Sequence, residues 1–120
     1  MFSLASQELQ ASPKVVVLDH RAEDSRAEIS LGSDSIQVNG LSHNSIGLFF
    51  KVECDTAAFA VDSKMSYMNP ESMERGERGG DAMTVTYTLT PKKKGIFTVY
   101  TVVNLSGMEE SRTKHTITIK

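Results

Sequence analysis

The sequence has few residues that could cross-link the chain or anchor it in a membrane. Its 120 residues include one cysteine, Cys54, so no disulfide can form within the chain. The bridge between the sheets of antibody domains is therefore excluded, and a reducing compartment is favoured. No stretch approaches the run of about 18 apolar residues that a membrane span needs. The first residues also lack the charged and apolar segments of a signal peptide. We expect a cytoplasmic protein, or a periplasmic or secreted one if a longer precursor carried a signal.

The sequence also lacks a large excess of charge of either sign. The formal net charge is -2, which gives no electrostatic reason to expect nucleic acid or an anionic membrane as the main partner. The apolar fraction of 39% and the charged fraction of 23% are ordinary for a soluble globular protein. A chain of this length can bury a core without disulfides or metal. We expect a flexible arm at residues 1–12 and a single domain at residues 13–120, with another protein as partner.

The residue patterns of enzymes and metal sites are missing as well. His20, His43 and His115 are far apart in the sequence and do not have the spacing of metal ligands, so we expect them on the surface or in loops. No Gly-x-Ser-x-Gly motif is present. Cys54 lacks the histidine and asparagine context of a nucleophile and continues the inward face of a predicted strand, so it is expected to be an inert core thiol. We predict no enzymatic activity, no cofactor and no metal.

The clearest pattern that is present is alternation of apolar and polar residues. Between Met83 and Leu89 every second residue is apolar and the residues between are threonines, which predicts a half-buried strand. Ile46 to Cys54 alternates in the same way. Shorter strands are predicted at residues 14–19, 27–31, 35–38, 57–61, 96–103 and 113–120. No helical periodicity of useful length is found. These features predict an all-β protein, an immunoglobulin-like β-sandwich of about seven strands.

Turns and loops are predicted from glycine, proline and charged residues between the strands. Asn39-Gly40 and the lysine-rich segment 92–94 predict turns. Residues 71–81 combine charges with the Gly79-Gly80 pair, so we expect a long exposed loop there, the most mobile internal segment.

Two aromatic residues are predicted on the outer faces of strands. Phe49 alternates with the core residues of its strand, and Tyr100 does the same in the strand at residues 96–103. An aromatic side chain left outside the core needs cover, and aromatic residues are enriched in protein interfaces. We therefore predict that the domain binds protein through a strand face or edge, with Phe49 and Tyr100 as contacts.

A family resemblance is carried by the segment VNGLSHNSIGLFFKVECDTAAFAVDSKMSYMNP at residues 38–70. It is similar to the centre of the major sperm protein domain, which also occurs in the VAMP-associated proteins. The matching positions, in order, are Val38, Ser42, Ile46, Gly47, Phe50, Lys51, Val52, Phe59, Val61 and Pro70.

This resemblance implies a function in cytoskeletal or scaffold assembly. Members of the family are cytosolic seven-stranded sandwiches without disulfides, and the sperm proteins dimerise and form filaments. Lys51 would belong to the binding strand, whereas Glu53 stands where peptide-binding members carry a second lysine and would repel an acidic peptide. The predicted protein-binding residues are thus Phe49, Lys51, Glu53 and Tyr100. The predicted partner is another protein or a second copy, as in a homodimer.

Two alternatives come from other parts of the chain. Residues 95–103 resemble the immunoglobulin-like modules of bacterial surfaces, which would imply adhesion or assembly in the periplasm or at the cell surface. Gly79-Gly80, placed before the threonine-rich strand, resembles the chagasin family of cysteine protease inhibitors. The Asn-Pro-Thr-Thr-Gly and Arg-Pro-Trp loops of that family are absent. Inhibition of papain would distinguish this last alternative from the other two.

Overall fold

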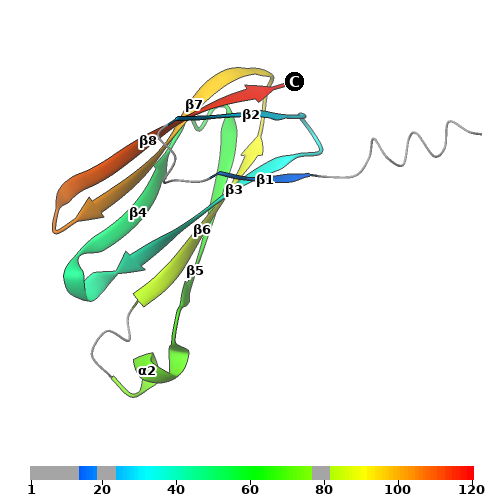
Figure 1. Cartoon of the computed structure of the whole chain (residues 1–120). Helices are drawn as coiled ribbons and strands as arrows, with labels where there is room; N and C mark the ends of the chain where they lie inside the picture. Colours follow the sequence, from blue (N-terminus) through cyan, green and yellow to red (C-terminus); the bar gives the residue numbers. More distant parts are fainter. Residues whose placement is uncertain (1–13, 19–23, 77–81) are drawn as a thin grey trace, which may run out of the picture.

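The structure is a computed structural model that describes residues 14–18, 24–76 and 82–120. The expected arm at residues 1–12 and the Gly79-Gly80 pair lie outside these ranges. Within these ranges the chain forms eight strands (Figure 1). They are β1 (Val15–Leu18), β2 (Asp24–Ile29), β3 (Ser35–His43), β4 (Leu48–Glu53), β5 (Phe59–Tyr67), β6 (Ala82–Pro91), β7 (Gly95–Leu105) and β8 (Met108–Ile119). A 3-10 helix, η1 (Asn44–Ile46), and one short α-helix, α2 (Pro70–Glu74), lie in connections.

The strands form two layers that are joined at one place. One layer has the order β2-β8-β7-β4, and the other contains β3-β6-β5 with β1 paired to β3. Strands β3 and β4 share a single residue pair, His43 with Leu48, so among the described residues strand pairing joins the layers only at the tip of this hairpin. The β1–β3 and β2–β8 pairs are parallel and the other pairs are antiparallel. The predicted fold class, an immunoglobulin-like β-sandwich, is confirmed.

The core lies between the two layers and is built from alternate residues of each strand. Strands β3 and β6 contribute one set of buried side chains, and β4, β7 and β8 contribute the facing set. The main members are Ile36, Val38, Val85, Leu89, Phe50, Val99, Ile117 and Ile119. At the far end of the core, Phe59 packs edge-on against Phe97 with ring centroids 6.0 Å apart. The alternation read from the sequence therefore identified the core face of β6 and, from Leu48 onward, that of β4.

The turn predicted at Asn39-Gly40 is wrong, because both residues lie inside β3. The ring of Phe50 lies directly over the backbone of Gly40: a Cβ atom at Gly40 would be 2.2 Å from Cγ of Phe50. Any side chain at this position would overlap the ring. The glycine is thus needed for close packing between the layers and has no role in a turn.

Other predicted boundaries also differ from the structure. Ile46 lies in η1 and is exposed, so the inward face of β4 begins at Leu48. Cys54 is only partly buried, although it packs against the core as expected, and burial raises the pKa of its thiol. The loop predicted at residues 71–81 begins with helix α2, and residues 77–81 lie outside the described ranges. The turn predicted at residues 92–94 is confirmed.

One histidine is part of the core, contrary to the prediction that all three lie on the surface or in loops. His115 of β8 is fully buried. Its Nε2 atom lies 2.9 Å from the hydroxyl of Thr101 on β7, and its Nδ1 atom is hydrogen-bonded to the hydroxyl of Ser25 on β2. His115 therefore links three neighbouring strands by polar contacts inside the sheet layer.

Candidate functional site

Three connections lie together at one end of the sandwich, which we call the loop end. They are the β3–β4 connection with η1, residues 68–76 of the β5–β6 connection with α2, and the β7–β8 turn at Ser106-Gly107. Leu105 of β7 pairs with Leu48 of β4, and Leu48 pairs with His43 of β3. His43 also pairs with Ala82 of β6. This unbroken series of pairs brings the ends of adjacent strands, and thus the three connections, to the same end of the fold (Figure 1).

The first and third connections are held to each other by backbone contacts. The amide of Ser106 donates a hydrogen bond to the carbonyl oxygen of Gly47, with an N···O distance of 2.9 Å. Gly47 has a left-handed backbone with φ of 69°, and its own amide donates to the carbonyl oxygen of Asn44. A Cβ atom at Gly47 would lie 3.2 Å from the backbone of Ser106. The loop end is thus preorganised by backbone geometry at Gly47 and Ser106.

Gly47→Ala is expected to destabilise the protein by about 1–2 kcal/mol, because alanine disfavours the left-handed conformation. Crowding against Ser106 adds to this loss. Gly107→Ala is the matched control, since Gly107 has φ of 82° with no neighbouring atom within 4 Å of a new Cβ. Chemical denaturation of both variants measures the difference. Equal losses would show that the contact between Gly47 and Ser106 contributes nothing.

The loop end exposes apolar side chains from its connections and from the strand ends beside them. Ile46 of η1 is 53% exposed, and Met108, just after the β7–β8 turn, is 74% exposed. Leu41 lies near the end of β3, and Met68 follows β5; both are also exposed. Apolar groups shown to solvent by separate connections and strand ends are typical of a surface that another protein covers. The loop end is therefore a candidate binding surface.

A groove of about 430 Å³ opens between the two layers beside the loop end. Its lining is mainly apolar and comes from β3, β4, β6 and β7: Asn39, Gly40, Leu41, Leu48, Phe50, Thr84 and Val103. The ring of Phe50 forms its floor over Gly40 and lies 5.9 Å from the ring of Tyr87. The hydroxyl of Tyr87 donates to the carbonyl oxygen of Phe50, which fixes the pair. The exposed side chain of Leu41 belongs both to this groove and to the loop end.

The four predicted binding residues lie together on the outer face of β4 and β7, beside the loop end and not within it. Glu53 pairs with Tyr100 across the two strands, and Phe49 pairs with Asn104. The Nζ atom of Lys51 lies 3.2 Å from a carboxylate oxygen of Glu53. Phe49 is exposed, as predicted. The structure thus groups these residues, and their role in binding stays a prediction.

An ion-pair cluster centred on Arg112 of β8 occupies the same outer face. One guanidinium nitrogen lies 2.7 Å from Glu53 and another lies 2.8 Å from Glu109. The guanidinium group also stacks 5.2 Å from the ring centre of Tyr100. Hydrogen bonds from Arg112 lower the pKa of both carboxyl groups, with Lys51 adding to the effect at Glu53. Arg112 thus pairs with two carboxylates and one aromatic ring on this face.

The described ranges contain no group of three or more histidine, cysteine, aspartate or glutamate residues that could hold a metal ion. Within those same ranges, none of the helices has the length and apolar character needed to cross a membrane.

Comparisons with known proteins identify similar folds. No protein-family model matches the chain, and no curated protein matches it. A cysteine protease inhibitor from Entamoeba histolytica, EhICP2, has a similar structure, with a TM-score of 0.70 and 18% identity. The match covers 89% of this chain and 96% of the inhibitor.

Two further solved structures are similar over nearly the whole chain. Amebosin has a TM-score of 0.57 at 9% identity, and the match covers 90% of this chain and 98% of amebosin. PbICP-C, solved in complex with falcipain-2, has a TM-score of 0.50 at 11% identity, with 89% and 99% covered. At these identities the comparisons establish the fold.

The resemblance to the major sperm protein domain is wrong, and with it the predicted role in cytoskeletal assembly. The solved structures that match the whole domain include EhICP2 and PbICP-C and give that assignment no support. The segment that suggested it, residues 38–70, is a run of ordinary sandwich elements. Gly40, read there as part of a small turn, is an internal strand residue beneath Phe50. Local strand patterns that recur in immunoglobulin-like folds account for the misleading match.

Proposed function

We propose that this chain is a protein inhibitor of papain-like cysteine proteases, of the chagasin type. The observation that carries the proposal is the loop end, where connections and the strand ends beside them expose apolar side chains on a rigid sandwich. The resemblance of the whole domain to EhICP2, a cysteine protease inhibitor, supports it, as does the resemblance to PbICP-C, solved with falcipain-2. An inhibitor performs no chemistry of its own, in agreement with the prediction of a non-enzymatic chain.

The proposed mechanism is occlusion. The loop end enters the active-site cleft of the protease and excludes substrate, and no bond is formed or broken. The hydrogen bond between Ser106 and Gly47 fixes two of the three connections before the protease is met. Loops that are ordered in advance lose little conformational entropy on binding, which favours tight association.

Ile46 and Met108 are the proposed apolar anchors of this contact. They belong to different elements, η1 and the start of β8, and they are more than half exposed in the free protein. Burying such side chains in a protease cleft removes apolar surface from water, the main favourable term in association. A carboxylate placed at either position would have to be desolvated in the same contact, which opposes binding.

The proposal predicts that the full chain inhibits papain and falcipain-2, and that Ile46→Asp and Met108→Asp raise the inhibition constant by about 30-fold or more. This corresponds to the loss of about 2 kcal/mol that an interface anchor contributes. The measurement is the steady-state rate of peptide hydrolysis as a function of inhibitor concentration. Ile96→Asp is the matched control, because Ile96 is 71% exposed but lies at the opposite end of β7.

The control should inhibit as the unaltered chain does. Chemical denaturation should show that all three variants remain folded. Absence of inhibition by the unaltered chain at micromolar concentration contradicts the proposed function. Equal weakening by Ile96→Asp and Ile46→Asp contradicts the assignment of the loop end as the contact.

A further inference from the structure

A second candidate surface is the free edge of β5, the outermost strand of its layer. Among the described residues, β5 pairs along one edge only, with β6. All its residues from Ala60 to Tyr67 are exposed. In the neighbouring strand β6, by contrast, Val85 and Leu89 are fully buried. Nine residues of regular strand thus offer backbone groups and side chains at the edge of the fold. An edge of this length is suited to adding another strand.

The hydrogen bonds at both ends of β5 define which backbone groups point outward. The amide of Met68 donates to the carbonyl oxygen of Ala82, and the amide of Lys92 donates to that of Ala58. Backbone bonding alternates along an antiparallel strand. The amides and carbonyl oxygens of even-numbered residues of β5 therefore point towards β6. Those of odd-numbered residues point to the free edge. Val61, Ser63 and Met65 supply the outward groups.

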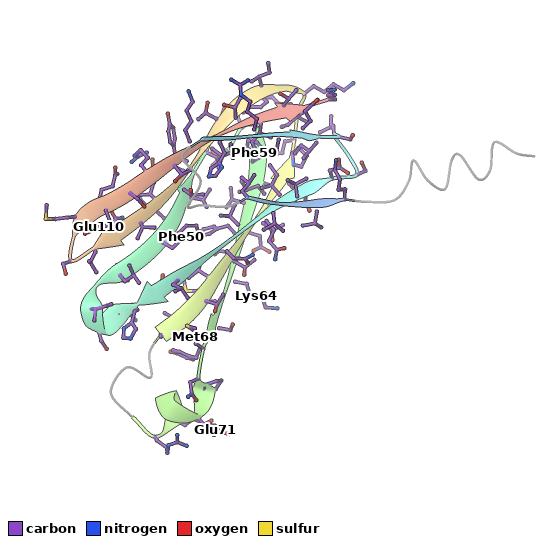
Figure 2. The ribbon with its side chains drawn as sticks, in the orientation of Figure 1. Phe50, Phe59, Lys64, Met68, Glu71 and Glu110 are labelled. Atoms are coloured by element: carbon purple, nitrogen blue, oxygen red, sulfur yellow. The ribbon has the colours of Figure 1, made fainter. Side chains whose placement is uncertain are left out.

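The side chains of β5 divide into an apolar set and a charged set. Val61 pairs with Leu89, a fully buried core residue, so Val61, Met65 and Tyr67 lie on the inner face. These three are between 41% and 57% exposed, since the opposite layer does not cover them. Asp62 and Lys64 lie on the outer face. Figure 2 shows Lys64 extending from β5 away from the other strands.

We propose that β5 binds a second copy of this chain, with the two β5 strands antiparallel and Ser63 opposite Ser63 of the partner subunit. In this register Asp62 lies opposite the partner subunit's Lys64 on the outer face, and the reverse pair completes the symmetry. On the inner face Val61 lies opposite the partner subunit's Met65. A twofold contact requires a surface that complements itself, and this edge does so in both charge and apolarity.

Neighbouring registers are disfavoured by the same residues. Outward backbone groups must meet outward groups, so an antiparallel pairing can shift only in steps that keep odd residues opposite odd residues. One such step places Asp62 opposite the partner subunit's Asp62, and the step in the other direction places Lys64 opposite the partner subunit's Lys64. Like charges directly opposite each other destabilise a pair of strands. The register centred on Ser63 is the one in which both charges are matched.

Charge variants of β5 test the proposal by sedimentation equilibrium from micromolar to millimolar concentration. The unaltered chain should dimerise. Lys64→Glu and Asp62→Lys should each weaken the dimer about tenfold or more, because each creates two like-charge contacts across the twofold axis. The double variant Asp62→Lys with Lys64→Asp restores opposite charges and should recover the dimer. Lys94→Glu, which changes an exposed lysine in the β6–β7 turn, is the matched control and should dimerise normally.

Amide hydrogen exchange gives an independent readout. The amides of Val61, Ser63 and Met65 should exchange more slowly as concentration rises, and those of the double variant should behave in the same way. A monomer at every concentration overturns the proposal. So does a dimer that is insensitive to the single charge changes, or one whose concentration-dependent protection lies outside β5. The proposal is independent of protease inhibition, which Lys64→Glu should leave unchanged.

Discussion

Gly40→Ala is expected to lower the free energy of unfolding by about 3 kcal/mol, the upper part of the range for overpacked cores. A new Cβ would lie 2.2 Å from one atom of the Phe50 ring and 2.3 Å from a second. The ring cannot easily move aside, because Phe50 is buried in the core and packs against Tyr87. Either the two layers separate at this point or Phe50 leaves its packed conformation.

Urea denaturation of a double-mutant cycle measures this contact. Phe50→Leu makes room above position 40, so the combination Gly40→Ala with Phe50→Leu should be more stable than the sum of the single losses predicts, by about 1–2 kcal/mol. Asn39→Ala, on the exposed face of the same strand, is the control and should change stability by less than about 1 kcal/mol. Simple additivity in the cycle would show that the ring of Phe50 is not what excludes a side chain at Gly40.

His115→Ala is also expected to lower the free energy of unfolding strongly, by about 3–5 kcal/mol, as truncation of a large buried ring does. The substitution opens a cavity between β2, β7 and β8, and it removes a hydrogen-bond partner from the hydroxyls of Ser25 and Thr101. A buried hydroxyl without a partner costs free energy in addition to the cavity. The folded protein should therefore loosen where β2 joins the sheet.

Thermal and chemical denaturation of His115→Ala, with Ser25→Ala as a comparison, test this expectation. Ser25→Ala removes one hydroxyl and leaves the ring in place, so it should cost only about 1 kcal/mol. Hydrogen exchange in His115→Ala should become faster in β2, which pairs with β8 along Ser25 and His115. A loss below about 1 kcal/mol for His115→Ala would mean that the site refills with neighbouring side chains or water.

The central strands could be predicted because burial on one face leaves a periodic record in the sequence. Met83 to Leu89 lies within β6, and residues 96–103 lie within β7. The burial of His115 was also open to prediction: it precedes Ile117 and Ile119 at intervals of two, so the same periodicity places it on the inner face of β8. For this residue the local periodicity is a better guide than the general tendency of histidine to lie at the surface.

Other elements left no such record. The sequence predicts that the strand at residues 57–61 ends at Val61, but β5 continues to Tyr67, because Ser63 interrupts the apolar series of Val61, Met65 and Tyr67. The first residues of β8, from Met108 to Arg112, are exposed and mostly polar, so the strand predicted from the sequence begins only at Thr113. The Asn39-Gly40 pair predicts a turn, but Gly40 lies within β3, where the ring of Phe50 leaves no room for a side chain. This contact is between the two layers, and sequence spacing does not reveal it.

The candidate site was the least accessible to sequence analysis. The loop end consists of three connections distant in sequence, and only the strand order brings them together. The Asn-Pro-Thr-Thr-Gly and Arg-Pro-Trp motifs of the chagasin family are absent, so motif comparison gave that alternative little support. The prediction that Phe49 is exposed was correct, yet Ile46, assigned to the core by alternation, belongs to the loop end.

The parallel pairing of β2 with β8 has a consequence for how the protein is made on the ribosome. Ser25 and His115 are bonded neighbours in the finished sheet but are 90 positions apart in the chain. At elongation rates of about 5–20 residues per second, β2 leaves the ribosome about 5–18 seconds before its pairing strand has been synthesised. The β3–β6–β5 layer can assemble in that interval, whereas β2 must wait as an unpaired nascent strand. Release of β8 therefore completes the fold, and chaperones that cover exposed strands have their longest opportunity to act on β2.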